Sequence, residues 1–476
     1  MRSVLTSRRG HIRRGRARAL LAAVAGALAL TGAGATPGLA VGSVGRGHGA
    51  GASLYPAGAE YPRKLAHPYE FAHGSSNTGG IIAGGGAPTK AGARRKKKPK
   101  LGLRGDPARA LVAYAAMQQN FYIPGTGLYI GEPYSYLWPF SQALVATVSV
   151  SGIRGQAAKQ AVIYARELHV RMYGLARYWS PAATASEPLP GEQPEGEGGT
   201  EGSESPETVG VAPPGLPSYD GNVLPPGGVS YYDDNEWVGI ELARLYAHRH
   251  EAPLLEKAEQ VMGFVMAGWQ TNPKLACPGG VPFSNSPSNT DRNTITNGPA
   301  AELGVQLYKL TGNQTYLQFA QVAYEWVRHC LLQPNGLYAD HIRQHGVVDQ
   351  TFWSYTQGAM IGAGTLLYQA TGNSAYLNQA RETANAAQSY FTIGRLLSEN
   401  PFFPSVYFRN LMYLDALTHD PPGARLAQSY VNYAWVNRRL KSGLFVFGSP
   451  PSSQLLVQAA VVQIYALLST PASTYF

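Results

Sequence analysis

Apolar residues recur at helical spacing along most of residues 106–476, and the alternation that strands show is scarce. Between 314 and 331, for example, Phe319, Val322 and Trp326 fall on one face of a helix. The same spacing predicts twelve helices, over 106–121, 138–151, 155–173, 234–249, 253–269, 297–311, 314–331, 355–371, 374–391, 407–417, 422–438 and 454–469. The body of the chain is therefore expected to be all-α.

One segment recurs at a fixed interval. Residues 307–317 and 367–377 share Leu-Tyr, Thr-Gly-Asn and Tyr-Leu at matching places, 60 residues apart. A weaker copy is Leu245-Tyr246 followed by Leu254-Leu255. A fixed period of this length is typical of repeat architectures. Because the Thr-Gly-Asn turn supplies a glycine where a helix must end, each copy is interpreted as a helical hairpin.

Six hairpins of about 60 residues account for the body of the chain. An open solenoid would expose two ends that need caps, whereas a closed ring has no ends. We therefore predict an (α/α)6 toroid, with short turns at one end and long connections at the other. Function usually resides on such long connections, which are 125–138, 181–232, 272–296, 333–353 and 395–406.

The N-terminal segment does not follow the helical pattern. An arginine-rich start, an apolar run from Ala19 to Leu30 and the small residues Gly38-Leu39-Ala40 predict a signal peptide over residues 1–40. The apolar run is shorter than the about 20 residues that span a membrane, so an uncleaved anchor is the less favoured alternative. The protein is expected to be secreted or associated with the cell envelope.

Residues 41–105 are rich in Gly, Ala and Pro and end in Arg94-Arg95-Lys96-Lys97-Lys98-Pro99-Lys100, which predicts a disordered basic linker. Residues 1–105 hold 18 of the 39 Lys and Arg residues and 2 of the 29 Asp and Glu residues, which leaves 21 basic and 27 acidic residues elsewhere. The mildly acidic body does not indicate nucleic-acid binding. The basic run is interpreted as a solvated spacer; the alternative is electrostatic attachment to an anionic cell envelope.

Two further features concern the long connections. Residues 181–218 are rich in Glu, Pro, Gly and Ser, which predicts a disordered and inert insertion. The two cysteines, Cys277 and Cys330, fall at the same end of neighbouring hairpins, so one disulfide is expected in an exported protein. The histidines form no zinc-type pattern, and neither a metal nor a cofactor is expected. We expect a monomer.

Candidate chemistry concentrates in Tyr231-Tyr232-Asp233-Asp234-Asn235-Glu236-Trp237, at the start of a predicted helix. Adjacent carboxylates repel each other, so holding them together costs free energy unless the pair has a structural or chemical role. One interpretation is helix capping, since Asp and Asn accept hydrogen bonds from free N–H groups and the helix dipole favours negative charge. The other is a nucleophile and a general acid acting on a glycosidic bond. Local spacing leaves both open.

The same segment resembles the aspartate motif of glycoside hydrolase family 76, the endo-α-1,6-mannanases. Three more segments agree with the family in the same order: Ile295-Thr296-Asn297-Gly298-Pro299-Ala300, Trp353-Ser354-Tyr355-Thr356-Gln357-Gly358 and Tyr407-Phe408-Arg409. The resemblance covers about residues 106–468. It departs at Gly279-Gly280-Val281-Pro282-Phe283, where the family has tryptophans, and at Thr356, where the family has asparagine.

The resemblance implies an (α/α)6 barrel and retaining hydrolysis of α-1,6-mannosidic linkages in α-mannan or a related polysaccharide. It also implies that Asp233 is the nucleophile and Asp234 the general acid/base. A retaining mechanism expects the two carboxyl groups roughly 5–5.5 Å apart. The charge of one aspartate raises the pKa of the other, as a proton donor near neutral pH requires.

Other residues at the long-connection end are candidates for sugar contacts, because aromatic rings stack on sugars and polar groups bind hydroxyls. The expected substrate-binding residues are Tyr232, Trp138, Asp291, Asn297, Trp353, Tyr355, Gln357 and Arg409. Each has a structural alternative: a core position for the aromatics, a helix cap for the amides, and a bridge between helices for the arginine. Asp340, His341 and Asp349 are interpreted as solvated loop charges.

Two other functions stay open at this point. The first is a hydrolase with the same toroid that acts on a different α-linked glycan or on an unsaturated uronide. A non-catalytic glycan-binding protein would keep an aromatic cleft without needing both aspartates, whose presence argues against it.

Overall fold

The computed structural model of the protein describes residues 104–156, 158–182, 215–223, 228–289, 291–419, 422–448 and 452–475. The expected signal peptide, nearly all of the basic linker and most of the predicted insertion lie outside these residues. None of the described helices has the length and apolar character that crossing a membrane requires.

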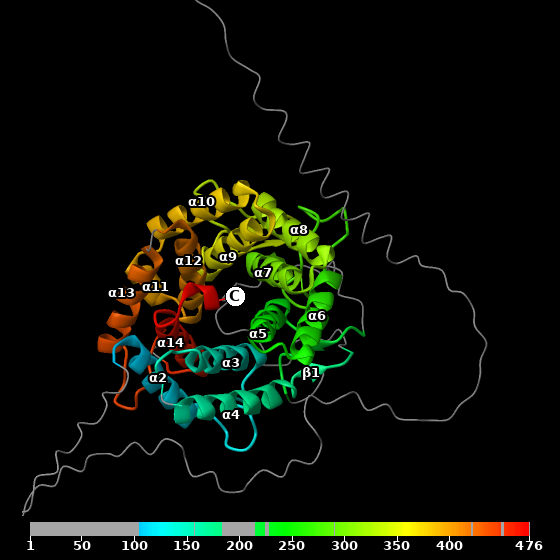
Figure 1. Ribbon diagram of the computed structural model, residues 1–476. Coiled ribbons are helices and arrows are strands. Elements are labelled where there is room, and N and C mark those ends of the chain that lie inside the picture. Colours follow the sequence, from blue (N-terminus) through cyan, green and yellow to red (C-terminus); the bar gives the residue numbers. More distant parts are fainter. Residues whose placement is uncertain are drawn as a thin grey trace, which may run out of the picture.

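Twelve long helices of the described chain form two concentric rings (Figure 1). The inner ring consists of α3 (Leu137–Ser151), α5 (Tyr232–Arg249), α7 (Thr294–Thr311), α9 (Ser354–Thr371), α12 (Phe402–Thr418) and α14 (Leu455–Leu467). The outer ring consists of α2 (Asp106–Phe121), α4 (Ala158–Leu175), α6 (Ala252–Ala267), α8 (Gln314–Cys330), α10 (Ser374–Tyr390) and α13 (Pro422–Asn437). Each inner helix packs against the next, and α14 packs against α3. The predicted (α/α)6 toroid is confirmed.

The sixth helix pair is formed by the two ends of the described chain. The first helix, α2, lies in the outer ring against the last long helix, α14, which lies in the inner ring (Figure 1). The other five pairs are consecutive hairpins, from α3–α4 to α12–α13. The ring is therefore closed by residues that are far apart in the sequence.

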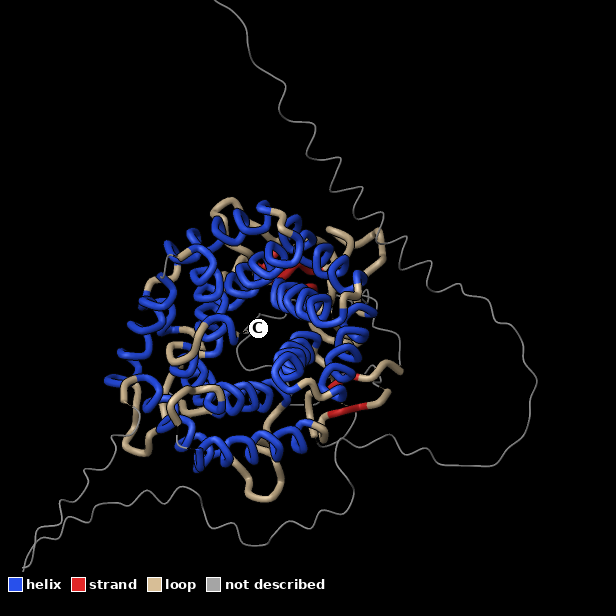
Figure 2. The backbone as a smooth tube through the Cα atoms, viewed as in Figure 1, coloured by secondary structure: helices blue, strands red, loops and turns tan. Residues whose placement is uncertain are grey.

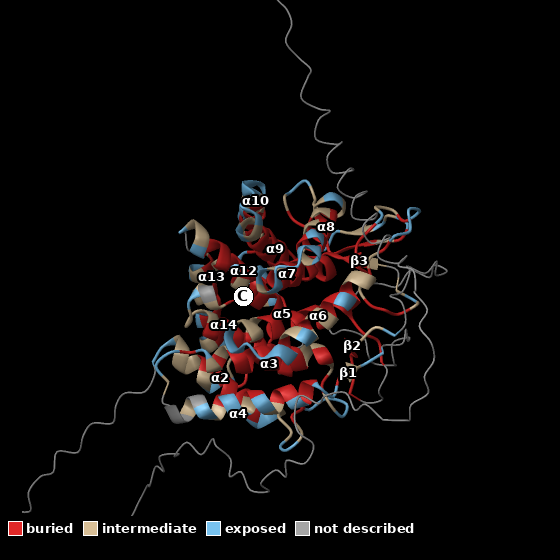
Figure 3. Cartoon of the chain, turned by 45° about the vertical axis from the view of Figure 1, so that its right-hand side comes forward, coloured by how far each residue is buried: buried red, intermediate tan, exposed pale blue. Residues whose placement is uncertain are grey.

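The helices of the two rings differ in which of their residues are buried. Every residue of α7 from Thr294 to Leu307 is buried, including its polar side chains, because an inner helix has neighbours on all sides. By contrast, α8 buries one stripe and exposes the other face, as expected for an outer helix. Figure 3 shows the same division, with buried inner helices and exposed outer faces. Close inner packing also uses glycine: a Cβ at Gly358 would lie 2.6 Å from the Cα of Tyr407.

The short turns follow the repeat found in the sequence. Gly312 and Gly372 end α7 and α9 in the left-handed conformation, with φ of 74° and 68°. Asn313 and Asn373 then cap α8 and α10 by accepting hydrogen bonds from N–H groups two residues on, at 3.0 and 3.1 Å. In the weaker copy, His250 occupies the left-handed position with φ of 54°.

At the opposite end, four inner helices carry a buried amide side chain at their fourth residue. Each amide accepts from the N–H and donates to the C=O of one residue in the preceding loop. The pairs are Asn235 with Tyr219 (2.7 and 2.9 Å), Asn297 with Val281 (2.8 and 3.0 Å), Gln357 with Tyr338 (2.8 and 2.9 Å) and Gln458 with Phe445 (2.8 and 2.8 Å). We call these four side chains the loop-anchoring amides, because they fix the long connections against the inner ring.

Short strands lie in the long connections (Figure 2). Strands β1 (Trp179–Ser180) and β2 (Ser218–Tyr219) pair antiparallel, and β3 (Asp291–Asn293), β4 (His341–Arg343) and β5 (Val348–Asp349) form an antiparallel sheet in that order. Since Ser218 pairs with Ser180, the predicted disordered insertion extends too far at its C-terminal end.

The predicted connection 395–406 is also corrected. It overlaps α11 (Ile393–Ser398) and includes the start of α12 at Phe402, five residues before the predicted helix. Pro404 lies in the first turn of α12, where a missing N–H costs nothing.

Cys277 and Cys330 form a disulfide, with their Cα atoms 6.1 Å apart. The bond ties the connection before β3 to the end of α8. The same connection is held by Arg292, whose guanidinium donates to the carbonyl oxygens of Ala276, Cys277 and Gly279, each at 2.7 Å.

Candidate active site

The aspartate pair lies in the first turn of α5, in the inner ring. Tyr231 precedes the helix and contributes no side-chain cap. Asp233 is half-buried, and its Oδ1 accepts a hydrogen bond from the N–H of Asp234 at 2.9 Å. Asp234 is only 7% exposed. Capping of a free N–H therefore accounts in part for Asp233 and leaves the burial of Asp234 unexplained.

Neighbouring loops hold this first turn in place. Tyr231 forms a bridge with Ser284, and the N–H of Tyr232 donates to the C=O of Phe283 at 3.1 Å. One turn on, the loop-anchoring amide of Asn235 binds the backbone next to β2. The backbone carrying the two carboxyl groups is thus fixed from both sides before any ligand binds.

The two carboxyl groups differ in environment. Burial raises the pKa of Asp234 to about 8. Burial and the charge of Asp234 also raise the pKa of Asp233, while hydrogen bonds from backbone N–H groups lower it. Asp233 accepts a hydrogen bond from a backbone N–H and is the more exposed of the two, and both features favour its carboxylate form.

Asp340 and His341 also belong to the site, so the interpretation of both as solvated charges is wrong. They are 4% and 7% exposed, and the Nδ1 of His341 lies 2.9 Å from the Oδ2 of Asp340. The negative charge of Asp340 contributes to the raised pKa of Asp233. Both residues follow Tyr338, which the loop-anchoring amide of Gln357 draws against the inner ring. Sequence spacing alone carries no sign of that anchor.

Asp291 lies beside these two residues. It occupies β3, which pairs with β4, so that Asn293 of β3 faces His341. Burial raises the pKa of Asp291, the charge of His341 opposes the rise, and the charge of Asp340 adds to it. For His341, burial lowers the pKa, but the hydrogen bond to Asp340 and the nearby carboxylates raise it overall. Asp291 therefore lies with Asp340 and His341 on the sheet β3–β4–β5, and its role in substrate binding stays a prediction.

An aromatic cluster lies at the starts of α3, α5, α9 and α12. Phe402 is its centre, with ring centroids 5.2 Å from Trp138 and 5.7 Å from Trp237. Trp353 extends the cluster through Phe403, at 5.3 Å. Among the predicted platforms, Trp138 and Trp353 are half-buried and keep part of their surface open.

Two of the aromatic residues predicted to contact substrate are packed inside the ring of helices. Tyr355 is 3% exposed and stacks on Phe403, with centroids 4.0 Å apart. Tyr232 is fully buried and stacks on Phe264 of α6, at 4.5 Å. Each ring fills a layer between helices, so neither offers a face to a sugar.

Three polar residues predicted to contact substrate have protein partners in the structure. Asn297 and Gln357 are fully buried, and their amide groups are engaged as loop-anchoring amides. Arg409 lies 3.2 Å from Glu302 of α7 and therefore bridges two inner helices instead of reaching the aspartate pair.

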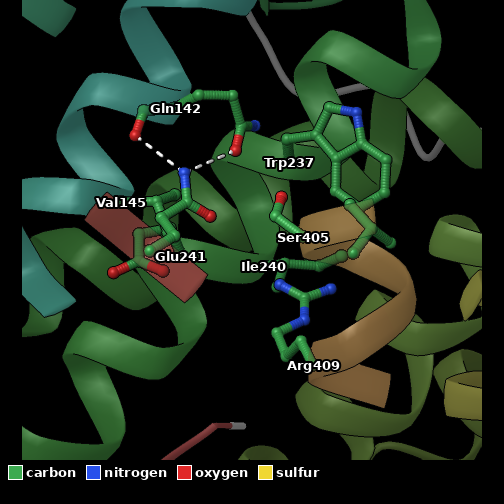
Figure 4. Close-up of a pocket in the computed structure, with 9 residues that line it drawn as sticks. Gln142, Val145, Trp237, Ile240, Glu241, Ser405 and Arg409 are labelled. Carbon is green, nitrogen blue, oxygen red and sulfur yellow. Dashed lines mark hydrogen bonds between the residues drawn. The ribbon is translucent and has the colours of Figure 1, made fainter. Parts of the chain in front are cut away.

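Beneath the aromatic cluster, polar side chains line a small internal cavity (Figure 4). Glu241 projects into it from α5 and Arg409 from α12. The amide of Gln463 donates to the backbone oxygen and to the Oε1 of Gln142, at 3.0 and 3.1 Å. The interior of the ring is therefore polar well below the level of the aspartates.

The chemistry available here is that of carboxyl groups. Within the described ranges, no group of three or more His, Cys, Asp and Glu side chains is arranged to hold a metal ion. A carboxylate beside a carboxylic acid can supply a nucleophile and a proton donor to one substrate bond.

The chain is similar in sequence and in fold to several known proteins. The sequence profile of glycosyl hydrolase family 76 matches residues 219–417, which run from the end of β2 into the last turn of α12. The mannan endo-1,6-alpha-mannosidase DCW1 of Saccharomyces cerevisiae is 28% identical over 155 residues, which cover 30% of this chain and 34% of the relative. The DCW1 protein of Candida glabrata is 28% identical over 106 residues, covering 21% and 24%. The alignments thus span 34% and 24% of these two relatives.

Solved structures share the whole ring. A family 76 mannosidase from Bacteroides thetaiotaomicron superimposes with a TM-score of 0.63 and 18% identity, covering 76% of this chain and 98% of that one. An inactive variant of an α-1,6-mannanase from Salegentibacter, with two consecutive aspartates changed to asparagine, is bound to α-1,6-mannotriose. It superimposes with a TM-score of 0.58 and 19% identity, covering 77% and 99%.

Proposed function

Because the chain belongs to glycoside hydrolase family 76, we propose that it cleaves α-1,6-mannosidic linkages within mannan or mannose-containing envelope glycans, with endo action and retention of configuration. The observation that carries the proposal is the adjacent pair Asp233 and Asp234 in the first turn of an inner helix, where burial raises the pKa of both carboxyl groups. Support also comes from the Salegentibacter mannanase, which is inactive when two consecutive aspartates are changed.

In the first step, a carboxylate oxygen of Asp233 attacks the anomeric carbon of the mannose. The bond from that carbon to the leaving oxygen breaks, and the proton of Asp234 moves to the leaving oxygen. The raised pKa of Asp234, about 8, keeps this proton available at neutral pH. The products are a shortened chain and a mannosyl ester of Asp233.

In the second step, water replaces the leaving chain. The carboxylate of Asp234 takes a proton from the water, whose oxygen attacks the anomeric carbon and releases Asp233. Two inversions at one carbon give net retention. The cycle ends with Asp233 ionised and Asp234 protonated, as it began.

Substrate contacts are assigned to side chains that keep open surface or buried charge near the pair. Trp138 and Trp353 are half-buried at the edge of the aromatic cluster and offer faces for sugar stacking. Asp291, Asp340 and His341 lie together on the adjoining sheet and can bind hydroxyl groups. This assignment replaces the buried Tyr232, Tyr355, Asn297, Gln357 and Arg409.

The same proposal places the enzyme outside the cytoplasm. A signal peptide over residues 1–40 would export it, and the disulfide between Cys277 and Cys330 suits an oxidising compartment. The basic run at 94–100 would hold the toroid near anionic envelope polymers or lipid by charge attraction.

Hydrolysis of linear α-1,6-mannan tests the activity. Purified protein is expected to release a range of oligosaccharides, and NMR of the first products is expected to show the α-anomer. Asp233→Asn should abolish turnover. Asp234→Asn should slow it by about 10² to 10⁴-fold on mannan. The same variant should retain glycosylation of an aryl α-mannoside whose leaving group needs no proton.

Different outcomes would redirect the proposal. Release of mannose alone from chain ends would replace endo with exo action. Cleavage confined to uronide-containing glycans would overturn the substrate assignment, and binding of α-mannan without cleavage would indicate a glycan-binding protein.

A further inference from the structure

Apolar side chains are exposed on the outer wall of the ring, where α13 ends. Tyr433 and Val436 are three residues apart and share one face of the helix, and Leu440 follows in the next connection. Their exposed fractions are 42%, 77% and 43%, and that of Val436 is the largest among the large hydrophobic side chains that the structure describes. Single exposed apolar residues are common, but three within eight residues are typical of an interaction surface.

The same part of the chain is basic. Arg438, Arg439 and Lys441 lie between and beside the three apolar residues. Residues 421–476 contain four Lys and Arg residues and no Asp or Glu, although residues 106–476 are mildly acidic overall. The positive charge is therefore not neutralised within this segment. We call the three apolar and three basic side chains the α13 patch.

Contacts with α2 hold positive charge beside the α13 patch. The guanidinium of Arg439 lies over the ring of Trp435 at 4.3 Å, and that of Arg109, from the first turn of α2, lies over the same ring at 5.1 Å. The Nη1 of Arg109 also donates to the Oδ1 of Asn432 at 2.8 Å. Asp106, the acidic residue of α2, lies 3.4 Å from Arg109. Helices α2 and α13 thus lie side by side at this wall (Figure 1).

The basic run of the N-terminal segment is connected to the same wall. Arg104 is exposed and lies two residues before α2. The run 94–100 holds six Lys and Arg residues and ends four residues before Arg104. Four residues span at most about 14 Å, so the run is attached close to the first turn of α2. Its charges add to those of the α13 patch.

This combination fits the surface of an anionic lipid bilayer. Anionic head groups attract nearby Lys and Arg side chains, and the interface accepts aliphatic side chains and tyrosine. An anionic polysaccharide would match the charges, but its hydrated surface offers nothing to Val436 and Leu440. A second copy of the chain, related by a two-fold axis, would bring the basic side chains against each other.

We propose that the α13 patch docks the ring onto anionic lipid, with Val436 and Leu440 entering the interface and the basic side chains meeting the head groups. Leu440 and Lys441 lie in the connection that the loop-anchoring amide of Gln458 holds, at the end of the ring that carries the aspartate pair. Docking therefore keeps the active-site end of the ring near the membrane. The proposal does not depend on which glycan the protein cleaves.

Sedimentation with lipid vesicles measures docking. The protein used is residues 41–476, because the apolar run of the predicted signal peptide would itself bind lipid. It should bind vesicles of phosphatidylcholine and phosphatidylglycerol, bind phosphatidylcholine alone weakly, and release as salt rises. Failure to bind the anionic vesicles overturns the proposal.

Two substitutions on the α13 patch test its two components. Lys441→Gln should weaken binding to the anionic vesicles about fivefold, and Val436→Ser about tenfold. The matched controls are Lys274→Gln, in the connection before β3, and Val347→Ser, in the turn between β4 and β5. Both change exposed residues and should bind like the wild type. The thermal midpoints of all four variants should stay at the wild-type value, because the side chains are exposed.

An environment-sensitive dye shows which face meets the lipid. The sequence has two cysteines and both form the disulfide, so Val436→Cys supplies a single thiol for labelling. Its emission should shift to the blue when anionic vesicles are added, and the same dye at Val347→Cys should not shift. If the protein binds vesicles and the dye at residue 436 does not shift, the basic run alone tethers the protein, and the proposal is overturned.

Other outcomes identify a different occupant. Equal vesicle binding by wild type and Val436→Ser, with competition by soluble polygalacturonate, would indicate an anionic polysaccharide and overturn the proposal. A dimer in solution that Val436→Ser dissociates would indicate a second copy and also overturn it. A protein that docks and cleaves no α-1,6-mannan overturns the proposed function alone. A protein that cleaves the mannan and does not dock overturns the docking proposal alone.

Discussion

Replacing Gln357 with leucine removes one loop-anchoring amide while nearly keeping its volume. The N–H of Tyr338 loses its acceptor at 2.8 Å, and the C=O of Tyr338 loses its donor at 2.9 Å. Because Tyr338 is fully buried, water cannot easily replace these bonds. Each orphaned buried group costs about 1–3 kcal/mol, so Gln357→Leu should lower the free energy of unfolding by roughly 2–6 kcal/mol.

The equivalent change at Asn297 should cost less. The C=O of Val281 also accepts from the hydroxyl of Thr296 at 3.0 Å, so only the N–H of Val281 is orphaned. We expect Asn297→Leu to lower the free energy of unfolding by about 1–3 kcal/mol. The hydroxyl group of Thr296 is therefore the reason why Asn297→Leu should destabilise the protein less than Gln357→Leu.

Equilibrium urea unfolding with the disulfide intact measures both changes. Asn385→Leu, on the exposed face of α10, is the control and should change stability by less than about 0.5 kcal/mol. The reasoning would be refuted if Gln357→Leu were as stable as this control and raised KM instead. That result would restore Gln357 as a sugar ligand.

Three further predictions concern the disulfide, a buried acid and a sugar platform. Loss of the bond between Cys277 and Cys330, which are 53 residues apart, should lower the free energy of unfolding by about 4 kcal/mol through loop entropy. Urea unfolding of the wild-type protein with and without reductant checks this, and Cys330→Ser, which lacks the bond, should not respond to reductant. Burial raises the pKa of Glu399 from 4.5 to about 7, so the folded state holds this proton more tightly than the unfolded state. The free energy of unfolding should therefore fall as pH rises from about 4.5 to about 7, and Glu399→Gln should lose this part of the pH dependence in urea titrations. Trp353→Ala should raise KM for α-1,6-mannan oligosaccharides several-fold with little change in kcat; an unchanged KM would remove Trp353 from the substrate site.

Periodicity was sufficient to predict the ring, because each hairpin repeats the same local physics. An inner helix, a left-handed residue and an Asn cap recur at 60-residue spacing, and all three are read from neighbouring residues. The sequence does not predict the start of α12, because a proline usually indicates a loop. Pro404 is tolerated only because it lies in the first turn of the helix, a position that the sequence alone does not reveal.

Side-chain direction could not be predicted in the same way. Asn297 and Gln357 occupy the expected helix starts, but their bonds run to residues 16 and 19 positions away. Those bonds depend on the path of a long connection, which has no periodicity. One of these bonds joins Gln357 to Tyr338, two residues before Asp340, so the burial of Asp340 could not be predicted either. The aspartate pair was found because its chemistry is contained in two consecutive residues.

The closure of the ring by α2 and α14 has a consequence for biogenesis. The two helices are separated by more than 330 residues, and α14 is buried along almost its whole length. Synthesis from the N-terminus delivers α14 last, so α2 lacks its partner helix until nearly the whole domain has been made. During this interval the apolar sides of α2, α3 and α12 face solvent, where they can aggregate or recruit chaperones. The native ring forms only once the last helix is available, so folding of the whole domain depends on completion of α14.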